Sequence, residues 1–498
     1  MQDYSTEQNA ISDFLTKKRT AAEIKGIFAP YGIYQQKNGL FMMRLRINAG
    51  RLTPDLLRNT VAAAKFSKAA YLHLTTRQDI QLHDVQPEKI IPVMKFCQEN
   101  GMPFRGGGGD TFRNITSSPL SGIRKTSVFD ILPYAEELKR YLFTSEKAFT
   151  LPRKIKIGMF DAPEDEWRAR IQDLGFLATV RNGTKGFKVW GGGGIGNQSA
   201  EGILLLDFIP ALDAAKAADA MVNFFFDHGN RENRAEARIR FMVKKMGADE
   251  FRKLFLEYFS KSGAPALIPM PEKKKERILP RSFSAHLNPG LSEWKASHTA
   301  PARREGESIV LIRVPYGNMK VRDLENLLRI MEKYSLSEYR LTPDRTLCCI
   351  DFPEDALPAL YDDLLRQLPH VDTTLKSFKG QIVTCIGNTV CKIGAMNSPE
   401  LGDRVAKRLD EYFSRHPEEK WKRAAEILGK IRISGCRSCC TAHPAADIGL
   451  NGSLANGIRG WQFSIRKDSG QILGERETNL TTNEEAEEKI ISLLNLKD

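Results

Sequence analysis

The stretch Tyr71–Glu88, "YLHLTTRQDIQLHDVQPE", decides the fold because the chain contains a second copy of it. The second copy is Glu338–Asp355, "EYRLTPDRTLCCIDFPED", in which a Leu-Thr pair recurs and Asp351 matches Asp84 at the same offset. Each copy follows a segment with helical periodicity, and each of these segments follows a strand-like run, "LFMMRLRINAG" and "SIVLIRVPYGN". The unit strand–helix–strand therefore occurs twice, which indicates an internal duplication.

A second pair of similar segments extends the duplication. "RKIKIGMFD", from Arg153, resembles "GKIRISGCR", from Gly429, and both alternate charged and apolar residues as half-buried strands do. Small and larger α/β segments thus alternate along the chain, and we predict an α+β protein made of two pseudo-symmetric halves. The predicted segments are 20–105 and 106–265 in the first half, a Pro-rich, charged connector at 266–304, and 305–375 and 376–498 in the second half.

Composition narrows the class of protein. The chain has 498 residues, a net charge of +13 and eight cysteines, too few for a disulfide-stapled secreted domain. Its start lacks an apolar run behind a basic tip, and its longest apolar stretch is interrupted by Asp and Lys. We therefore expect a cytoplasmic protein without a membrane span. The positive charge is compatible with nucleic acid, an acidic protein partner, anionic small molecules or simply a well-solvated surface.

The cysteines of the second half form two pairs. Cys385 and Cys391 are spaced C-x5-C in "VTCIGNTVCKIG", and Cys436 and Cys440 are spaced C-x3-C in "RISGCRSCCTAH". Four thiolates can bind zinc or an iron–sulfur cluster, and the C-x5-C spacing favours a cluster, since paired zinc ligands usually stand closer together. Three other cysteines are expected in the hydrophobic core, namely Cys97, Cys348 and Cys349.

The two cysteine pairs resemble the cluster motif of the siroheme-dependent sulfite and nitrite reductases. Further stretches that resemble this family are "MMRLRINAG", "LHLTTRQDIQLH", "FRNITSSPL", "LPRKIK", "VWGGGGIG" and "DHGNRENRAEAR". The resemblance implies that each half consists of a ferredoxin-like half-domain and a larger α/β domain. It also implies siroheme and a [4Fe–4S] cluster as cofactors, with Cys440 bridging the two and Cys439 not a ligand. The implied cluster ligands are Cys385, Cys391, Cys436 and Cys440.

Basic residues of the first half lie on strand-like segments at a spacing of two. Arg44 with Arg46, and Lys154 with Lys156, alternate with apolar residues, while "DIQLHD" places three polar residues on one face. A solvated strand face explains any single pair, but three such segments favour a shared anion pocket. The family resemblance implies that the substrate is bound by Arg44, Arg113, Lys154 and Lys156. It implies that siroheme, with its many carboxylates, is contacted by Arg77, Gln81, His83 and Arg153.

Two further patterns carry weaker expectations. Arg231, Arg234 and Arg238 lie at helical spacing, which favours a charged helix face over side chains that reach cofactor carboxylates. The glycine runs at 106–109 and 191–194 predict close approach of the backbone to a flat macrocycle, although a flexible turn explains the first run equally well.

The resemblance implies the six-electron reduction of sulfite to sulfide, as in ferredoxin-type sulfite reductase haemoproteins. Lys156 favours sulfite, because nitrite enzymes tend to carry Asn at that position, and nitrite reduction is the alternative. No flavin or nicotinamide domain is recognisable, so we expect a separate electron donor, ferredoxin, and neither nucleic acid nor a membrane as partner. The rival classes are a zinc-stabilised nucleic-acid-binding protein, disfavoured by dispersed basic residues, and a non-catalytic siroheme carrier, disfavoured by the cation pocket.

Overall fold

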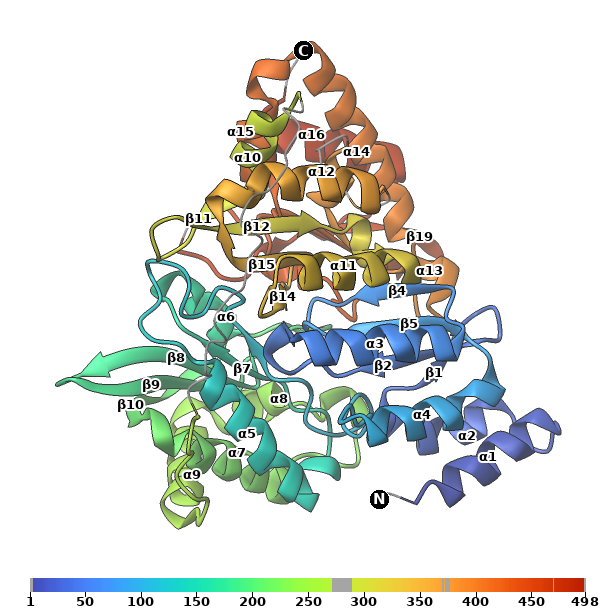
Figure 1. Ribbon diagram of the computed structural model, residues 1–498. Coiled ribbons are helices and arrows are strands. Elements are labelled where there is room, and N and C mark those ends of the chain that lie inside the picture. The colour runs from blue at the N-terminus through green and yellow to red at the C-terminus, as the bar shows by residue number, and fades with distance from the viewer. Residues whose placement is uncertain (1–2, 271–288, 370, 372–376, 469, 497–498) are drawn as a thin grey trace.

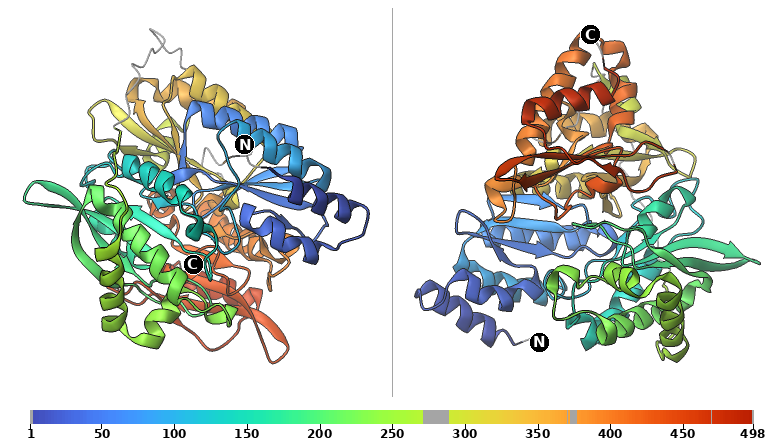
Figure 2. Two further views of the ribbon diagram at one scale, coloured as in Figure 1. Left: turned by 90° about the horizontal axis from the view of Figure 1, so that it is seen from below. Right: turned by 180° about the vertical axis from the view of Figure 1, so that it is seen from behind.

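The computed structural model describes residues 3–270, 289–369, 371, 377–468 and 470–496. Within these residues the strands form four sheets of five strands each. In Figure 1 the N-terminal half, coloured blue to green, is the lower part of the molecule, and the C-terminal half, yellow to red, is the upper part. The view from behind in Figure 2 shows the same arrangement, with the two termini at opposite ends.

The first copy of the repeat forms an antiparallel sheet, here sheet A, in the order β1-β2-β5-β4-β13. Its strands are β1 (Tyr34–Gln35), β2 (Phe41–Leu45), β5 (Ile80–Val85), β4 (Tyr71–Leu74) and β13 (Asn318–Met319). Helix α3 (Pro54–Ser67) precedes β4, and α4 (Ile90–Glu99) follows β5. Helix α3 begins with an N-cap, because the Thr53 side chain accepts a hydrogen bond from the Leu56 N–H and Pro54 occupies the first turn.

The second copy forms sheet B in the order β11-β12-β15-β14-β3. Its strands are β11 (Thr299–Pro301), β12 (Glu307–Arg313), β15 (Thr346–Pro353), β14 (Tyr339–Leu341) and β3 (Arg51–Leu52), and its helices are α11 (Val321–Lys333) and α12 (Leu357–Gln367). Sheets A and B share one apolar core, to which α3 contributes Leu57 and α11 contributes Leu324 and Leu327. Figure 1 shows α3 and α11 next to each other.

Sheets A and B exchange a strand. β3 precedes α3 in the first half but pairs with β14, and β13 precedes α11 in the second half but pairs with β4. Arg51 therefore lies opposite Arg340, and Asn318 lies opposite His73, in the sheet of the other half. Each exchanged strand is two residues long, so neither shows an alternation that a sequence could reveal. The exchange joins the two halves by backbone hydrogen bonds.

The backbone repeats the duplication residue by residue. Left-handed residues recur at the offset of the sequence repeat, in the pairs Ala49/Tyr316, Gly50/Gly317, Lys68/Ser335, Gln78/Arg345 and Asp84/Asp351. Residues other than glycine seldom adopt positive φ. Their recurrence at matched positions confirms the predicted duplication in three dimensions.

Each half also contains a larger mixed sheet. Sheet C has the order β10-β9-β8-β7-β6, and sheet D has the order β16-β17-β18-β19-β20. The strands of sheet C are β6 (Thr116–Ser117), β7 (Ile157–Phe160), β8 (Leu174–Arg181), β9 (Thr184–Gly191) and β10 (Ile203–Pro210). Those of sheet D are β16 (Val383–Thr384), β17 (Ile431–Ser434), β18 (Ile448–Ala455), β19 (Ile458–Ile465) and β20 (Glu475–Arg476). In both sheets the first three strands along the chain are parallel and the remaining two pair antiparallel.

Helices pack against the larger sheets and give each its own apolar core. With sheet C lie α5 (Leu132–Thr144), α6 (Glu166–Arg170), α7 (Ala214–His228), α8 (Ile239–Met246) and α9 (Ala248–Lys261). With sheet D lie α13 (Gly387–Val390), α14 (Ser398–Arg415), α15 (Pro417–Ile427) and α16 (Asn483–Leu493). At the N-terminal end, α1 (Ser5–Leu15) and α2 (Ala21–Phe28) precede sheet A.

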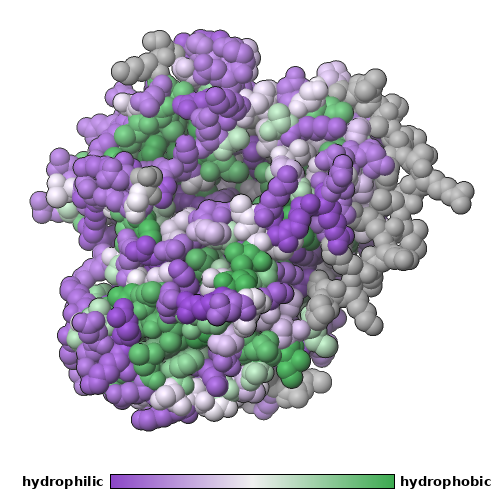
Figure 3. All heavy atoms as spheres, turned by 90° about the vertical axis from the view of Figure 1, so that its left-hand side faces the viewer, coloured by the Kyte–Doolittle hydropathy of each residue, from purple (hydrophilic) through white to green (hydrophobic). Residues whose placement is uncertain are grey.

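The surface is mixed in character. Hydrophilic side chains are spread over the whole face shown in Figure 3, with patches of apolar side chains between them. Across the described ranges, no helix combines the length and the apolar character that crossing a bilayer requires.

The predicted connector, 266–304, lies partly outside the described residues, because 271–288 are not described. Its later part is folded: it contains α10 (Leu291–His298) and β11. Trp294 of α10 is buried in the core shared by sheets A and B, and β11 pairs with β12. Residues 291–301 therefore belong to the second small sheet and do not form a loose connection.

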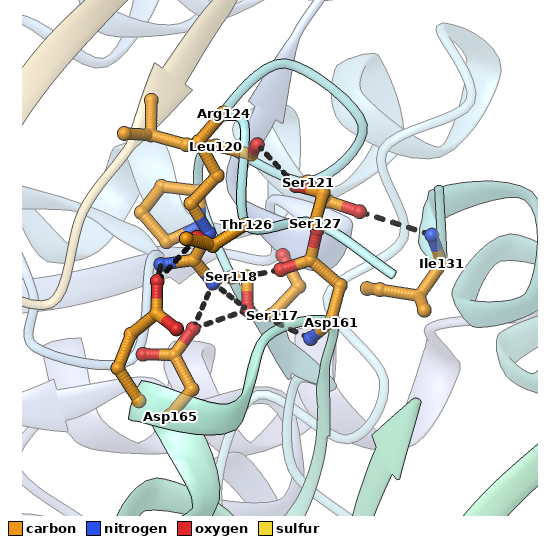
Figure 4. Close-up of polar contacts among 12 residues, drawn as sticks. Ser117, Ser118, Leu120, Ser121, Arg124, Thr126, Ser127, Ile131, Asp161 and Asp165 are labelled. Atoms are coloured by element: carbon orange, nitrogen blue, oxygen red, sulfur yellow. Dashed lines mark hydrogen bonds and ion pairs between the residues drawn. The ribbon is translucent and has the colours of Figure 1, made fainter. Parts of the chain in front are cut away.

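A buried ion-pair network follows the first two strands of sheet C (Figure 4). The Arg124 guanidinium donates to the Asp161 carboxylate at 2.8 Å and also contacts Asp165, and Ser118 Oγ donates to Asp165 at 2.6 Å. The Asp161 side chain has no exposed surface. The same loop contacts the second half, since Arg340 donates to the Ser121 carbonyl at 2.7 Å. The network therefore fixes the loop that joins sheet C to sheet B.

The positions in this network match those of the cysteine pairs in the other half. Ser118 directly follows β6, as Cys385 directly follows β16, and Arg124 stands at the same distance from Ser118 as Cys391 from Cys385. Asp161 follows β7 directly, in the place of the residue that precedes Cys436 after β17. Where one half carries thiols, the other carries charged side chains that satisfy each other.

We predict that Arg124→Ala destabilises the protein by about 3–5 kcal/mol, because it leaves two buried carboxylates without their cation. Arg181→Ala is the matched control, since Arg181 and Asp207 form an ion pair in which both side chains are about half exposed. Its removal should cost at most about 1 kcal/mol. Urea unfolding followed by fluorescence measures both. Equal effects of the two substitutions would contradict the structural role of the network.

Candidate active site

The structure brings the four predicted cluster cysteines together between sheet D and sheet A. The pKa of the Cys440 thiol is raised to about 12, first by burial and then by the nearby thiols of Cys385, Cys436 and Cys391. Solvent nevertheless reaches the Cys440 residue. The Thr76 hydroxyl, from the loop after β4, donates to the Cys440 carbonyl at 2.5 Å, so the two halves meet at this residue.

Backbone N–H groups surround the thiols. Cys385 Sγ accepts from Gly435 N at 3.0 Å and from Gly387 N at 3.4 Å, and Cys391 accepts from the two residues that follow Lys392. A Cβ on Gly435 would lie 2.7 Å from the Met396 carbonyl, so only glycine lets the chain pass here. N–H groups directed at sulfur are a recognised means of tuning iron–sulfur clusters.

The arrangement of the thiols suits a group larger than one ion. In the described part of the chain, no three His, Cys, Asp or Glu side chains lie close enough together to hold a single metal ion. An iron–sulfur cluster takes one cysteine at each of several iron atoms, so its ligands lie further apart. Cys439 is buried and its thiol lies 3.3 Å from the Arg437 carbonyl and 3.5 Å from the Gly196 carbonyl. It contacts protein carbonyls, as expected of a cysteine that is not a ligand.

The four predicted substrate-binding cations lie beside these thiols. Arg44 is on β2, Arg113 precedes β6, and Lys154 and Lys156 precede β7. Arg113 and Arg44 repel each other, Lys154 is repelled by Lys156 and Arg113, and Lys156 is attracted to Cys440. Cations that are distant in sequence therefore form one cation cluster where sheets A, C and D meet.

Burial and mutual repulsion lower the pKa values of Arg113, Lys154 and Lys156. Burial, then Arg238 and Arg77, lower the pKa of Lys156 to about 7, and burial, then Lys156, lower that of Lys154 well below its usual range. The pKa of Arg113 is lowered to about 9, again chiefly by burial. Lysines poised near neutrality exchange protons readily, which is a property of catalytic sites.

The predicted siroheme contacts occupy different positions. Arg77 belongs to the cation cluster and donates to the Asn114 carbonyl at 2.7 Å. Gln81 lies on β5 opposite Arg44. Arg153 is partly exposed at the rim, where it pairs with Asp110 at 2.7 Å. His83 is fully enclosed, with no exposed surface.

Arg238 was missed by the sequence analysis, which placed it on a charged helix face. The structure contradicts that prediction: Arg238 precedes α8, is buried, and donates to Asp173 at 2.7 Å and 3.2 Å. It lies in the cation cluster with Lys154 and Lys156. Arg238 is held in place by a tertiary ion pair with Asp173, and no local sequence pattern predicts such a pair. Arg234 pairs with Asp110 and so joins Arg153 at the rim.

The glycine runs make close backbone contacts within the protein. A Cβ on Gly108 would lie 2.1 Å from the Ala29 carbonyl, and one on Gly193 would lie 2.1 Å from the Arg170 carbonyl. Gly194 and the nearby Gly196 instead border Arg240, whose Nε and Nη1 atoms are buried without a hydrogen-bond partner in the described residues. The first run therefore serves packing. The second run leads to an unpaired guanidinium.

The surplus of positive charge in the cation cluster fits an anionic cofactor beside the four thiols. Two buried carboxylates, Asp79 and Asp173, compensate only part of the positive charge that surrounds them. The members of the cation cluster are Arg44, Arg77, Arg113, Lys154, Lys156 and Arg238. An unpaired buried charge is costly, and a macrocycle with many carboxylates would neutralise this surplus.

Family comparison agrees with this geometry. Residues 108–262 match the family described as "Nitrite and sulphite reductase 4Fe-4S domain". Residues 34–100 and 302–367 each match "Nitrite/Sulfite reductase ferredoxin-like half domain", which confirms the predicted ferredoxin-like repeats. Together the matched residues make up more than half of the chain.

Individual relatives extend over most of the chain. It is 27% identical over 449 residues to a ferredoxin–nitrite reductase of Synechococcus elongatus, covering 88% of this chain and 79% of that protein. It is 27% identical to an assimilatory ferredoxin-dependent nitrite reductase of Haloferax mediterranei, covering 86% and 74%. Among solved structures, the NirA protein of Mycobacterium tuberculosis superposes with a TM-score of 0.77 at 20% identity, covering 97% of this chain and 89% of that one.

These comparisons correct one prediction and confirm others. The relatives are named nitrite reductases, so the prediction of a sulfite reductase, which depended on Lys156, is wrong. The predicted cofactors, siroheme and a [4Fe–4S] cluster, are those of the matched family. The chain belongs to the siroheme- and [4Fe–4S]-dependent nitrite/sulfite reductase family.

Proposed function

We propose that the protein is a ferredoxin-dependent nitrite reductase that converts nitrite to ammonium. The observation that carries this proposal is the gathering of four cations beside the four-thiol site, where Lys154 and Lys156 interact electrostatically with Cys440. The names of the relatives support nitrite as the substrate and ferredoxin as the donor. The reaction consumes six electrons and eight protons and releases ammonium and two water molecules, so the site must bind an anion and deliver protons repeatedly.

Each set of residues has a proposed role toward a cofactor. Cys385, Cys391, Cys436 and Cys440 would hold the cluster, and Cys440 would also lie beside the siroheme. Arg77 and Arg153 would pair with siroheme carboxylates, and Gln81 would add a hydrogen bond. Together the two cofactors supply single-electron transfer and an iron atom that can bind the substrate.

The substrate-binding cations act on charge and on protons. Arg44 and Arg113 offer fixed N–H donors that bind and orient the anion, and their charge stabilises negative charge that builds up during reduction. The Lys156 ammonium, with a pKa of about 7, can donate a proton to a departing oxygen and be protonated again from water. Lys154, repelled by Lys156, is suited to the same task.

We also propose that the electron donor is ferredoxin and that the protein is cytoplasmic. A protein with a net charge of +13 has a favourable long-range attraction to an acidic donor such as ferredoxin. A cytoplasmic location, expected from the sequence, is a prediction that fractionation of the producing cells would test.

Turnover measurements test the proposed function. The purified holoprotein, supplied with chemically reduced ferredoxin, should form ammonium from nitrite with a higher kcat/KM than it forms sulfide from sulfite. Substrates are supplied separately, and ammonium and sulfide are measured directly. A higher kcat/KM for sulfite, or no ammonium from nitrite, would refute nitrite as the substrate.

We predict that Cys440→Ser yields a folded protein without nitrite turnover, because the thiolate that joins the cluster to siroheme is lost. Cluster iron should fall and the siroheme absorption bands should shift. Cys439→Ser is the matched control, since the Cys439 thiol contacts the Arg437 and Gly196 carbonyls and the His443 ring and is not among the proposed ligands. Normal spectra in Cys440→Ser, together with loss of cluster iron in Cys439→Ser, would show that the cluster ligands are misidentified.

We predict that Lys156→Met raises the melting temperature of the cofactor-free protein more at about pH 6 than at about pH 9.5. Below pH 7 the folded protein holds a charged ammonium in a buried, positive site, and the full destabilisation applies. As pH rises from about 7 toward the pKa of an unfolded lysine, about 10.4, this destabilisation is relieved.

Lys245→Met provides the control for this pH dependence, because Lys245 is an exposed residue of α8. Its substitution should change the melting temperature little at either pH. If Lys156→Met had the same effect at both values of pH, the depressed pKa of Lys156 would be refuted.

A further inference from the structure

A row of polar side chains crosses sheet A, starting at Arg44 of the cation cluster. Arg44 of β2 lies opposite Gln81 of β5, Gln81 lies opposite His73 of β4, and His73 lies opposite Asn318 of β13. His83 is two residues beyond Gln81 on the same face. The other face of these strands carries buried apolar residues, such as Leu82. The row therefore connects a proposed substrate-binding arginine with the interior of the sheet.

The orientation of the Gln81 amide follows from its neighbours. A guanidinium can only donate hydrogen bonds, so the Gln81 oxygen faces Arg44 and accepts from Nη2 at 2.8 Å and from Nε at 3.3 Å. The amide nitrogen then donates to His83 Nε2 at 3.2 Å. His83 is therefore neutral, with its proton on Nδ1. Burial, which lowers the pKa of His83 to about 4, favours the same neutral form.

These contacts leave Arg44 with a defined binding edge. A guanidinium has five N–H groups. Gln81 accepts two of them, and the Gly107 carbonyl accepts one from Nη1 at 2.7 Å. One N–H on Nη1 and one on Nη2 therefore stay available for a bound anion. The direction of this edge depends on Gln81.

The His83 side chain is enclosed within the protein. Its side chain has no exposed surface, and its ring stacks on Tyr71 with centroids 4.6 Å apart and planes 13° apart. His83 Nδ1 is buried and has no hydrogen-bond partner in the described residues. Leaving a buried donor unpaired is unfavourable, and such groups are rare in folded proteins. The only polar contact of the ring within the described chain is the one that orients Gln81.

We propose that His83 is a positioning residue that acts through Gln81: its ring nitrogen fixes the amide so that the amide oxygen directs Arg44 toward the bound anion. The inference rests on the proposed function for the identity of that anion. It differs from the role implied by the family resemblance, in which His83 contacts siroheme directly. Without the acceptor at His83, the Gln81 amide can rotate, and its NH2 group would then face a guanidinium that cannot accept.

Optical titration of the holoprotein with nitrite tests the proposal. His83→Phe keeps the ring and its stack on Tyr71 but removes the acceptor. We expect the Kd for nitrite to rise about tenfold, comparable to the loss of one charge-assisted hydrogen bond. KM should rise with it, while kcat and siroheme content change little, because anion binding before and during reduction is affected alike.

His83→Gln is the conservative variant, because its side-chain oxygen can occupy the position of Nε2 and accept from Gln81. It should restore a Kd close to that of the wild type, which a purely structural role of the ring would not predict. Gln81→Met should raise Kd by itself, and adding His83→Phe to it should cause no further rise. Tyr71→Phe, which keeps the stack, should leave Kd unchanged.

Three outcomes would overturn the proposal. An unchanged Kd in His83→Phe would show that Gln81 needs no support. Loss of siroheme, with normal nitrite binding in the molecules that retain it, would show direct contact with the cofactor. An additive rise in the double variant would show that His83 acts independently of Gln81. If the wild type binds nitrite but forms no ammonium, the proposed function fails, while the effect of His83 on Kd still decides the positioning role.

Discussion

A surplus of buried positive charge at the meeting point of the two halves is the constraint on which this structure depends. Arg77, Arg113, Lys154 and Lys156 repel one another in a site where burial already disfavours their charged forms. Two buried carboxylates compensate for part of this charge, and the sheets hold the cations in place against their repulsion. Such a site is stable when an anionic cofactor fills it, so cofactor binding and folding should be strongly coupled.

The duplication explains how one site arises at the junction of two similar halves. The exchanged strands β3 and β13 join the small sheets, and the two larger sheets have the same topology. The chemistry differs at matched positions: thiols at Cys385 and Cys391 correspond to Ser118 and Arg124, which belong to an ion-pair network (Figure 4). At these positions one half thus carries thiols and the other carries an ion-pair network.

Much of the fold followed from the sequence, because long segments carry periodicity and the repeat doubles the signal. The structure brings the thiols of the two cysteine pairs close together, at the positions that the sequence motif singled out. The strand exchange was not predictable, because two-residue strands have no pattern. Arg238 was misjudged because its role depends on Asp173, a partner distant in sequence. The substrate was wrong because it was inferred from Lys156 alone, and one residue in a crowded cation pocket does not determine which anion is preferred.

The most direct test of the account is the cofactor content of the purified holoprotein. The visible spectrum, the metal content and the acid-labile sulfide are measured on the same sample. The structure predicts siroheme absorption bands together with the iron and sulfide of one [4Fe–4S] cluster per chain. A colourless protein that contains zinc, or a cluster without a macrocycle, would contradict the claim that the cation cluster exists to bind an anionic cofactor next to the four thiols.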